Sequence, residues 1–186
     1  IPRQAKSAAT LISLGADEIH MGLLSELGPI DPQIRGLPAL ALEKSLEKIA
    51  AMAEEFPGSS DMFAKYLDEN MNIGELGFID RLNESATQYA QRLLGERKFP
   101  NDKPCKELAD HFTNHYKDHD FVIDVDEAQS LLGTEMIKQD TDEYMAAETI
   151  YDFMDFMGML SYVHKKKTIQ CVGSLEDGID FDDFDD

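Results

Sequence analysis

Basic side chains are scarce in this sequence. Seventeen lysines and arginines stand against 37 aspartates and glutamates, and the formal net charge at pH 7 is −20. Nucleic-acid binding needs a basic surface, so this charge balance argues against that class of function. The last stretch, EDGIDFDDFDD, has seven acidic side chains and no basic one, but the remainder of the chain is acidic as well. Acidity is therefore a general property of the protein.

Cysteines and long apolar runs are scarce too. Two cysteines, Cys105 and Cys171, define no disulfide framework, and a reducing compartment is the simpler interpretation. No apolar run approaches the roughly 20 residues of a membrane-spanning helix, and no signal peptide is visible. The sequence contains no dinucleotide fingerprint, P-loop or haem motif, so we expect no cofactor.

The chain is long enough for one domain with a buried core. We expect this domain over residues 1–172, followed by an acidic, disordered tail over 173–186. Proline and glycine mark a loop over 23–38 and a helix breaker over 73–77. Periodicity predicts helices over 7–14, 39–56, 62–71, about 78 to 94, 102–115, 126–132 and 141–164, and strands over 18–21, 121–124 and 168–172.

The helix predicted over 141–164 is unusually rich in methionine and aromatic residues. They are too numerous for one narrow apolar stripe, which favours burial on two sides or contact with a second protomer. An ordinary core helix is the simpler interpretation, although methionine-rich faces also suit adaptable interfaces.

The segment over 5–33, AKSAATLISLGADEIHMGLLSELGPIDPQ, is the most informative part of the chain. Ser7 stands among small residues at the start of a predicted helix, where unpaired N–H groups can stabilise a developing anion. A strand and then Gly-Pro and Asp-Pro turns follow. On residue types alone, a serine that caps an alanine-rich helix is the favoured interpretation.

The order of SAAT, ADEI and LGPIDPQ in this segment resembles the serine dehydrogenase proteinase family, which is related to signal peptide peptidase A within the Clp-protease/crotonase superfamily. The similarity continues more weakly through LADHFTNH (108–115) and FVIDVDEAQSLLG (121–133). The resemblance implies an α/β fold of ββα units, N-terminally incomplete, with a largely helical C-terminal extension. It also implies a serine peptidase-like hydrolase in which Ser7 is the nucleophile of an acyl-enzyme mechanism.

The same resemblance sets expectations for partners and location. A peptide or protein would be the substrate, and the protein would form a homo-oligomer. Because only six residues precede Ser7, we expect the oxyanion-hole loop of the family to lie upstream of Ile1. Location would be cytoplasmic, or membrane-associated through such an upstream segment.

Ser7 needs a base to accept its proton, and the sequence leaves that base open. Clp-type proteases carry a histidine on the strand beyond the helix, but the corresponding region here contains Asp31. A Ser-Lys dyad is the alternative, because a buried lysine can act as a base. Lys48 is our candidate, although the EKSLEK context is typical of a solvated helix face. Asp31 could orient a base, contact another protomer or simply form a turn.

Three histidines, His111, His115 and His119, invite a zinc interpretation. HFTNH lacks the glutamate that a zinc-protease HExxH supplies, so we interpret these histidines as structural and expect no metal. The acidic stretch over 118–127 likewise lacks the glycine and glutamate of an EF-hand loop.

Two other functions stay open at this stage. One is a catalytically inactive family member that acts as an oligomeric scaffold or binding module, which the absence of a convincing base favours. The other keeps the superfamily fold but performs acyl-CoA chemistry, and the absence of an obvious basic patch for CoA argues against it.

Overall fold

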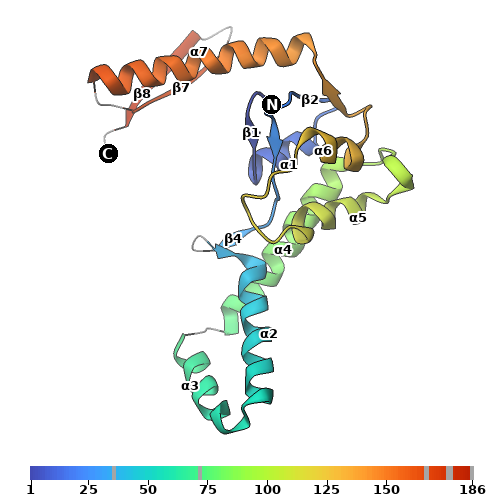
Figure 1. The fold of residues 1–186 in the computed structure, drawn as a ribbon, viewed down its shortest axis with the longest axis vertical. Coiled ribbons are helices and arrows are strands. Elements are labelled where there is room, and N and C mark those ends of the chain that lie inside the picture. Colours follow the sequence, from blue (N-terminus) through green and yellow to red (C-terminus); the bar gives the residue numbers. More distant parts are fainter. Residues whose placement is uncertain (35–36, 71–72, 166–167, 175–177, 185–186) are drawn as a thin grey trace.

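The protein is described by a computed structural model that covers residues 1–34, 37–70, 73–165, 168–174 and 178–184. It is an α/β structure with three parts (Figure 1). A body of short strands and helices lies between a helical arm, which extends downward in the view, and the long helix α7 above. No helix in these ranges is long and apolar enough to cross a membrane.

The body is built on two pairs of parallel strands. Strand β1 (Gln4–Ala5) pairs with β3 (Glu26–Leu27), and β2 (Ile19–Met21) pairs with β6 (Ile137–Gln139). Helix α1 (Ala8–Leu14) follows β1, and the connection between the parallel strands β1 and β3 contains α1 and then β2. The predicted helix over 7–14 and the predicted strand over 18–21 are thus confirmed to within a residue.

The core of the body comes from two distant parts of the sequence, residues 1–34 and 90–144. Its largest fully buried apolar side chains are Leu14, Met21, Leu27, Leu94, Leu108, Phe112, Ile123 and Ile137. Backbone bonds join the same two parts, since Leu27 and Ile123 each donate to the other's carbonyl, at 2.9 and 3.0 Å. The strand predicted over 121–124 is reduced to this single bridge.

The arm consists of α2 (Ala39–Glu55), the 3-10 turn η1 (Pro57–Ser59), α3 (Ser60–Asn70) and most of α4 (Ile73–Leu94), with the short hairpin of β4 (Gln33–Ile34) and β5 (Leu37–Pro38) at its base. Among the side chains that the structure describes, no apolar one between Ile30 and Ala90 is buried. The arm therefore adds nothing to the core of the body.

One boundary prediction in the arm is wrong. Residues 73–77 were expected to break the helix, but α4 runs through them from Ile73. A glycine inside an exposed helix costs only about 1 kcal/mol relative to alanine, so two of them do not stop a helix of this length.

The second half of the chain closes the body and then leaves it. The 3-10 turn η2 (Pro100–Asp102) leads to α5 (Cys105–Asp110), which continues as the π-helical turn η3 (His111–His115). Helix α6 (Val125–Leu132) begins at Asp124, whose carboxylate accepts a hydrogen bond from the Glu127 amide at 2.9 Å. Helix α7 (Asp142–Lys165) is the longest, in agreement with the prediction over 141–164.

The C-terminal segment differs from the disordered tail expected over 173–186. Strand β7 (Thr168–Ser174) pairs antiparallel with β8 (Gly178–Phe184). Apolar Ile179 and Phe181 alternate with Asp180 and Asp182, which is the period of a strand. The acidic composition of the segment favoured disorder over this alternation in the sequence-based prediction.

A cluster of aromatic rings surrounds η3. The rings of His111 and His115 stack with their centroids 4.1 Å apart, and His111 Nε2 lies 3.2 Å from the Tyr116 hydroxyl, which donates to Glu127 at 2.7 Å. Burial, followed by the neighbouring His115 and Lys103, lowers the pKa of His111. Burial and the bond to Glu127 raise the pKa of Tyr116.

We predict that His111 makes the fold less stable in mild acid. Its folded-state pKa lies below the ordinary value of about 6.5, so the unfolded chain binds more protons around that pH. Neutral His111 contributes fully to the free energy of unfolding above the ordinary pKa of about 6.5. This contribution is lost as the pH falls from there through the lower pKa of the folded state. Urea unfolding between about pH 7 and about pH 5 should therefore show a smaller loss of stability for His111→Gln than for the wild type.

The wild type measured at each pH is the control for His111→Gln. The comparison removes the changes that the many carboxylates contribute to both proteins. Equal pH dependence of His111→Gln and the wild type would contradict the assignment.

Candidate active site

Ser7 lies in the tight turn between β1 and α1. Its backbone dihedral angles are φ 54° and ψ −116°, which match the first central position of a type II′ turn. The Ala9 amide closes this turn by donating to the Lys6 carbonyl at 3.0 Å. A residue with a side chain is strained at such a positive φ, by about 1–3 kcal/mol. The protein therefore places serine where glycine would be relaxed.

The Ser7 hydroxyl does not stabilise the helix that it precedes. Serine is a preferred N-cap, yet no side-chain hydrogen bond caps α1. Ser7 is partly buried, while Ala8 and Ala9 beside it are exposed. A strained strand-to-helix turn that carries a serine is similar in backbone geometry to the nucleophile elbow of α/β-hydrolases. The structure therefore does not support the interpretation in which the Ser7 hydroxyl caps α1.

The turn is fixed by Thr10, the last residue of SAAT. Thr10 is completely buried, and its Oγ1 donates to the Ala5 carbonyl at 2.5 Å and accepts from the Gly28 amide at 3.1 Å. One hydroxyl thus ties α1 to both β1 and β3. Gly28 is required for the same close packing, because a Cβ there would come within 2.8 Å of Lys6 Cγ. These contacts explain the threonine and the glycine of the two motifs.

Asp31 is almost completely buried, with 3% of its side chain exposed. One carboxylate oxygen lies 2.8 Å from His119 Nδ1, and the other accepts from Gln33 Nε2 at 3.2 Å. A buried carboxylate needs such partners to offset its lost hydration. If Nδ1–H donates to the carboxylate, the lone pair of His119 is on Nε2, which is the state of a general base.

Hydrogen bonds link the segments that carry Ser7, Asp31 and His119. The Ser7 amide donates to the Pro29 carbonyl at 3.1 Å, two residues before Asp31. Lys6, beside Ser7, donates through Nζ to the carbonyl of Asp120, beside His119, at 2.7 Å. Ser7 and Asp31 follow the carboxyl ends of the parallel strands β1 and β3, where functional loops of α/β proteins gather.

Lys48 lies in a different place. It is exposed on α2, and α2 runs away from α1 and the body (Figure 1). On the same helix Lys44 pairs with Glu47 at 2.8 Å, as expected of a solvated face. Sequence reasoning missed His119, which it grouped with His111 and His115. The available signal was Asp31 itself, which occupies the position where Clp-type proteases carry their histidine.

The three histidines are separated in the structure. His111 and His115 stack on each other, whereas His119 pairs with Asp31. Within the described residues, no three histidine, cysteine, aspartate or glutamate side chains are grouped so that they could hold a metal ion.

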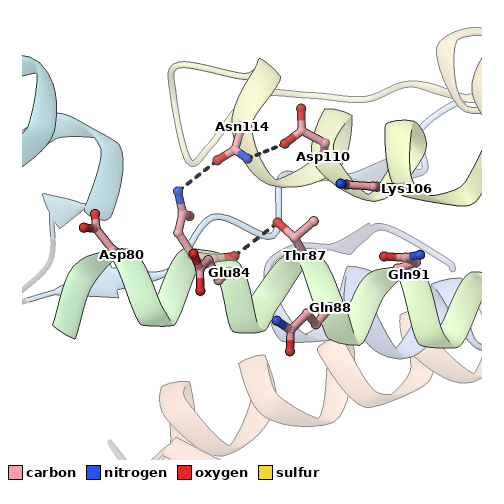
Figure 2. A pocket seen from close by; sticks show the side chains of 9 residues that line it. Asp80, Glu84, Thr87, Gln88, Gln91, Lys106, Asp110 and Asn114 are labelled. Atoms are coloured by element: carbon pink, nitrogen blue, oxygen red, sulfur yellow. Dashed lines mark hydrogen bonds between the residues drawn. The ribbon is translucent and has the colours of Figure 1, made fainter. Parts of the chain in front are cut away.

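A polar cleft of about 700 Å³ opens between α4 and the segment of α5 and η3 (Figure 2). Asn83 donates to Asn114 at 2.9 Å, and Asn114 donates to Asp110 at 2.8 Å, so the two walls are hydrogen-bonded to each other. Its lining residues are Asp80, Asn83, Glu84, Thr87, Gln88, Gln91, Lys106, Asp110 and Asn114. Ser7, Asp31 and His119 are absent from this lining, so the cleft is separate from the candidate active site.

Comparison with known proteins supports the motif analysis. The model of the ClpP-like SDH-type serine proteinase family matches residues 1–174. Two uncharacterized proteins of Methanocaldococcus jannaschii, MJ0137 and MJ1495, are 29% and 28% identical to the chain over 131 residues. These matches cover 70% of this chain but only 40% and 39% of the relatives, so the chain spans less than half of their length.

No solved structure matches the chain at a significant level. The family match covers nearly the whole chain and agrees with the resemblance carried by residues 5–33, which is thereby confirmed. The chain therefore belongs to the family of ClpP-like SDH-type serine proteinases.

Proposed function

We propose that this protein is a serine peptidase in which Ser7 is the nucleophile, His119 the general base and Asp31 the residue that orients the base. The observation that carries the proposal is the strained, uncapped Ser7, whose amide is hydrogen-bonded to Pro29, two residues before the buried Asp31 that pairs with His119. Membership of a family of serine proteinases supports the reaction class. A peptide or protein is the proposed substrate.

In this mechanism His119 Nε2 takes the proton of Ser7 Oγ while the oxygen attacks the carbonyl carbon of the scissile bond. The carbonyl oxygen becomes an oxyanion, and the Ala8 amide, directly after the nucleophile, is positioned to donate to it. Asp31 stabilises the imidazolium that forms. His119 then gives its proton to the leaving amine, and the C–N bond breaks to leave an acyl-enzyme.

Water completes the cycle by the same steps. His119 Nε2 takes a proton from the attacking water, a second tetrahedral oxyanion forms, and its collapse releases the carboxylic acid and returns the proton to Ser7. Ser7 and His119 share no hydrogen bond in the described structure. Such bonds are often long in free enzymes and tighten when substrate binds.

This assignment replaces Lys48 as the base on a physical ground. A lysine can act as a base when burial disfavours its charged form, and Lys48 is exposed on the arm. His119 instead has its second ring nitrogen held by a buried carboxylate. The alternative function, an inactive scaffold, requires that Ser7 never becomes acylated.

We predict that a fluorophosphonate probe labels Ser7 in a manner that depends on His119. Ser7→Ala should abolish labelling, and His119→Gln should slow it by at least about 100-fold, because the general base is lost. Asp31→Asn should slow it as well, through the wrong orientation of the imidazole. The rate of labelling is followed by gel fluorescence or intact mass.

His115→Gln and Lys48→Ala are the matched controls, and both should be labelled at the wild-type rate. Loss of labelling in Lys48→Ala but not in His119→Gln would return the role of base to the lysine. A wild-type protein that resists both the probe and chromogenic esters would favour the scaffold. Circular dichroism of each variant excludes loss of folding as the cause.

We also predict that the strain at Ser7 reduces stability. In urea unfolding, the free energy of unfolding of Ser7→Gly should exceed that of Ser7→Ala by about 1 kcal/mol or more, because only glycine relaxes at this φ. Ser13, within α1, is the control site at which the order should reverse, since alanine is the better helix former there. Equal stability of Ser7→Gly and Ser7→Ala would contradict the strain.

A further inference from the structure

Helix α7 packs with only one side on the rest of the chain. Tyr144 and Ser161 are buried on that side, and β7 lies along part of the helix (Figure 1). The opposite side is apolar but open: Phe153, Phe156 and Val163 are 57%, 51% and 64% exposed. A core helix, the simpler interpretation of the sequence, would not leave these side chains in water.

Six of the exposed residues of α7, most of them apolar, follow a regular spacing. Ala146, Thr149, Phe153, Phe156, Leu160 and Val163 are separated by three and four residues in alternation. We call this set the α7 seam. Such spacing places side chains in one line along a helix and is the pattern by which two helices pack side by side.

The whole chain exposes more surface than a compact protein of its length. Its accessible area is 12,965 Å², whereas a compact protein of 186 residues would expose about 9,000 Å². The excess is several times the roughly 800 Å² that each partner buries in a stable protein–protein interface. The arm accounts for part of this excess area. The α7 seam is the part of the excess area whose side chains are mostly apolar and evenly spaced along one line of the helix.

Charge along α7 specifies the direction of a partner helix. Asp142 and Glu143 are exposed at its start, and His164 is exposed near its end, where three consecutive lysines, residues 165–167, follow in the sequence. An antiparallel copy of α7 would place the basic end of each helix beside the acidic start of the other and would also oppose the helix dipoles. A parallel copy would place like charges together.

We propose that α7 pairs antiparallel with α7 of a second copy of this chain in a two-fold symmetric dimer. With the whole seam engaged, Phe153 faces Phe156 across the axis, Thr149 faces Leu160, and Ala146 faces Val163. Because Ser7, Asp31 and His119 lie outside α7, the dimer does not depend on the peptidase chemistry.

Directed disulfide formation tests this geometry. In a Cys105→Ser, Cys171→Ser background, Thr149→Cys and Leu160→Cys proteins of different tag mass are mixed and oxidised. The antiparallel seam predicts a disulfide between the two different chains at a yield well above either like-chain disulfide. Like-chain disulfides of Thr149→Cys in excess would show parallel pairing and overturn the proposal. Ile150→Cys, exposed but off the seam, is the control and should cross-link poorly with Leu160→Cys.

Mass in solution gives a second, independent test by light scattering or sedimentation. Phe156→Asp should halve the wild-type mass and weaken association by about 100-fold or more, because it places a charge between apolar side chains. Its fold should persist, since Phe156 is half exposed in the single chain. Ile150→Asp should keep the wild-type mass.

Two outcomes would overturn the proposal. One is a wild-type chain that stays monomeric at high micromolar protein concentration, which would mean that the α7 seam does not bind a second copy. The other is a Phe156→Asp variant that keeps the wild-type mass. Fluorophosphonate labelling of the same samples distinguishes failure of the dimer from failure of the peptidase, because a monomeric but labelled variant loses only the former.

Discussion

The buried hydroxyl of Thr10 is the contact on which the site depends. It joins the carbonyl of Ala5 in β1 to the amide of Gly28 after β3, and so holds α1 against both strands. The two strands are only two residues long, too short to fix the turn between β1 and α1 by their own ladder bonds. With Thr10 in place, the strained backbone of Ser7 has no freedom to relax. A residue with positive φ persists only where its surroundings over-determine it, and this clamp supplies that condition.

The same clamp decides where the charged residues lie. The Ser7 amide is bonded to Pro29, so the chain after β3 must pass beside the serine and deliver Asp31 there. Asp31 is buried and can be accommodated only with polar partners, and His119 and Gln33 supply them. The positions of the proposed nucleophile, base and orienting carboxylate therefore follow from one local packing arrangement and one requirement to satisfy a buried carboxylate.

Ser7 and Asp31 could be predicted from the sequence because both belong to one continuous motif of known spacing. His119 could not, since it lies 88 residues from Asp31 and the pairing depends on how η3 and the following loop fold back on the body. The helices α1, α2, α6 and α7 were predictable because the signals that mark them, such as apolar periodicity and the Asp124 cap of α6, are local. The continuous α4 and strand β8 were not, because local signals of glycine content and acidity pointed the other way.

The body and the rest of the chain use apolar residues differently. In the body, apolar side chains from two distant segments meet and exclude water, so folding alone satisfies them. In α7 the apolar side chains are as regular in spacing but remain in water within a single chain. A chain with a net charge of −20 repels its own copies, so only a contact that combines apolar area with opposite charges at its two ends can offset that repulsion. The antiparallel arrangement of α7 has both properties, and since salt screens the net repulsion over about 10 Å, added salt should strengthen the association even though it weakens the pairs of opposite charge at the ends.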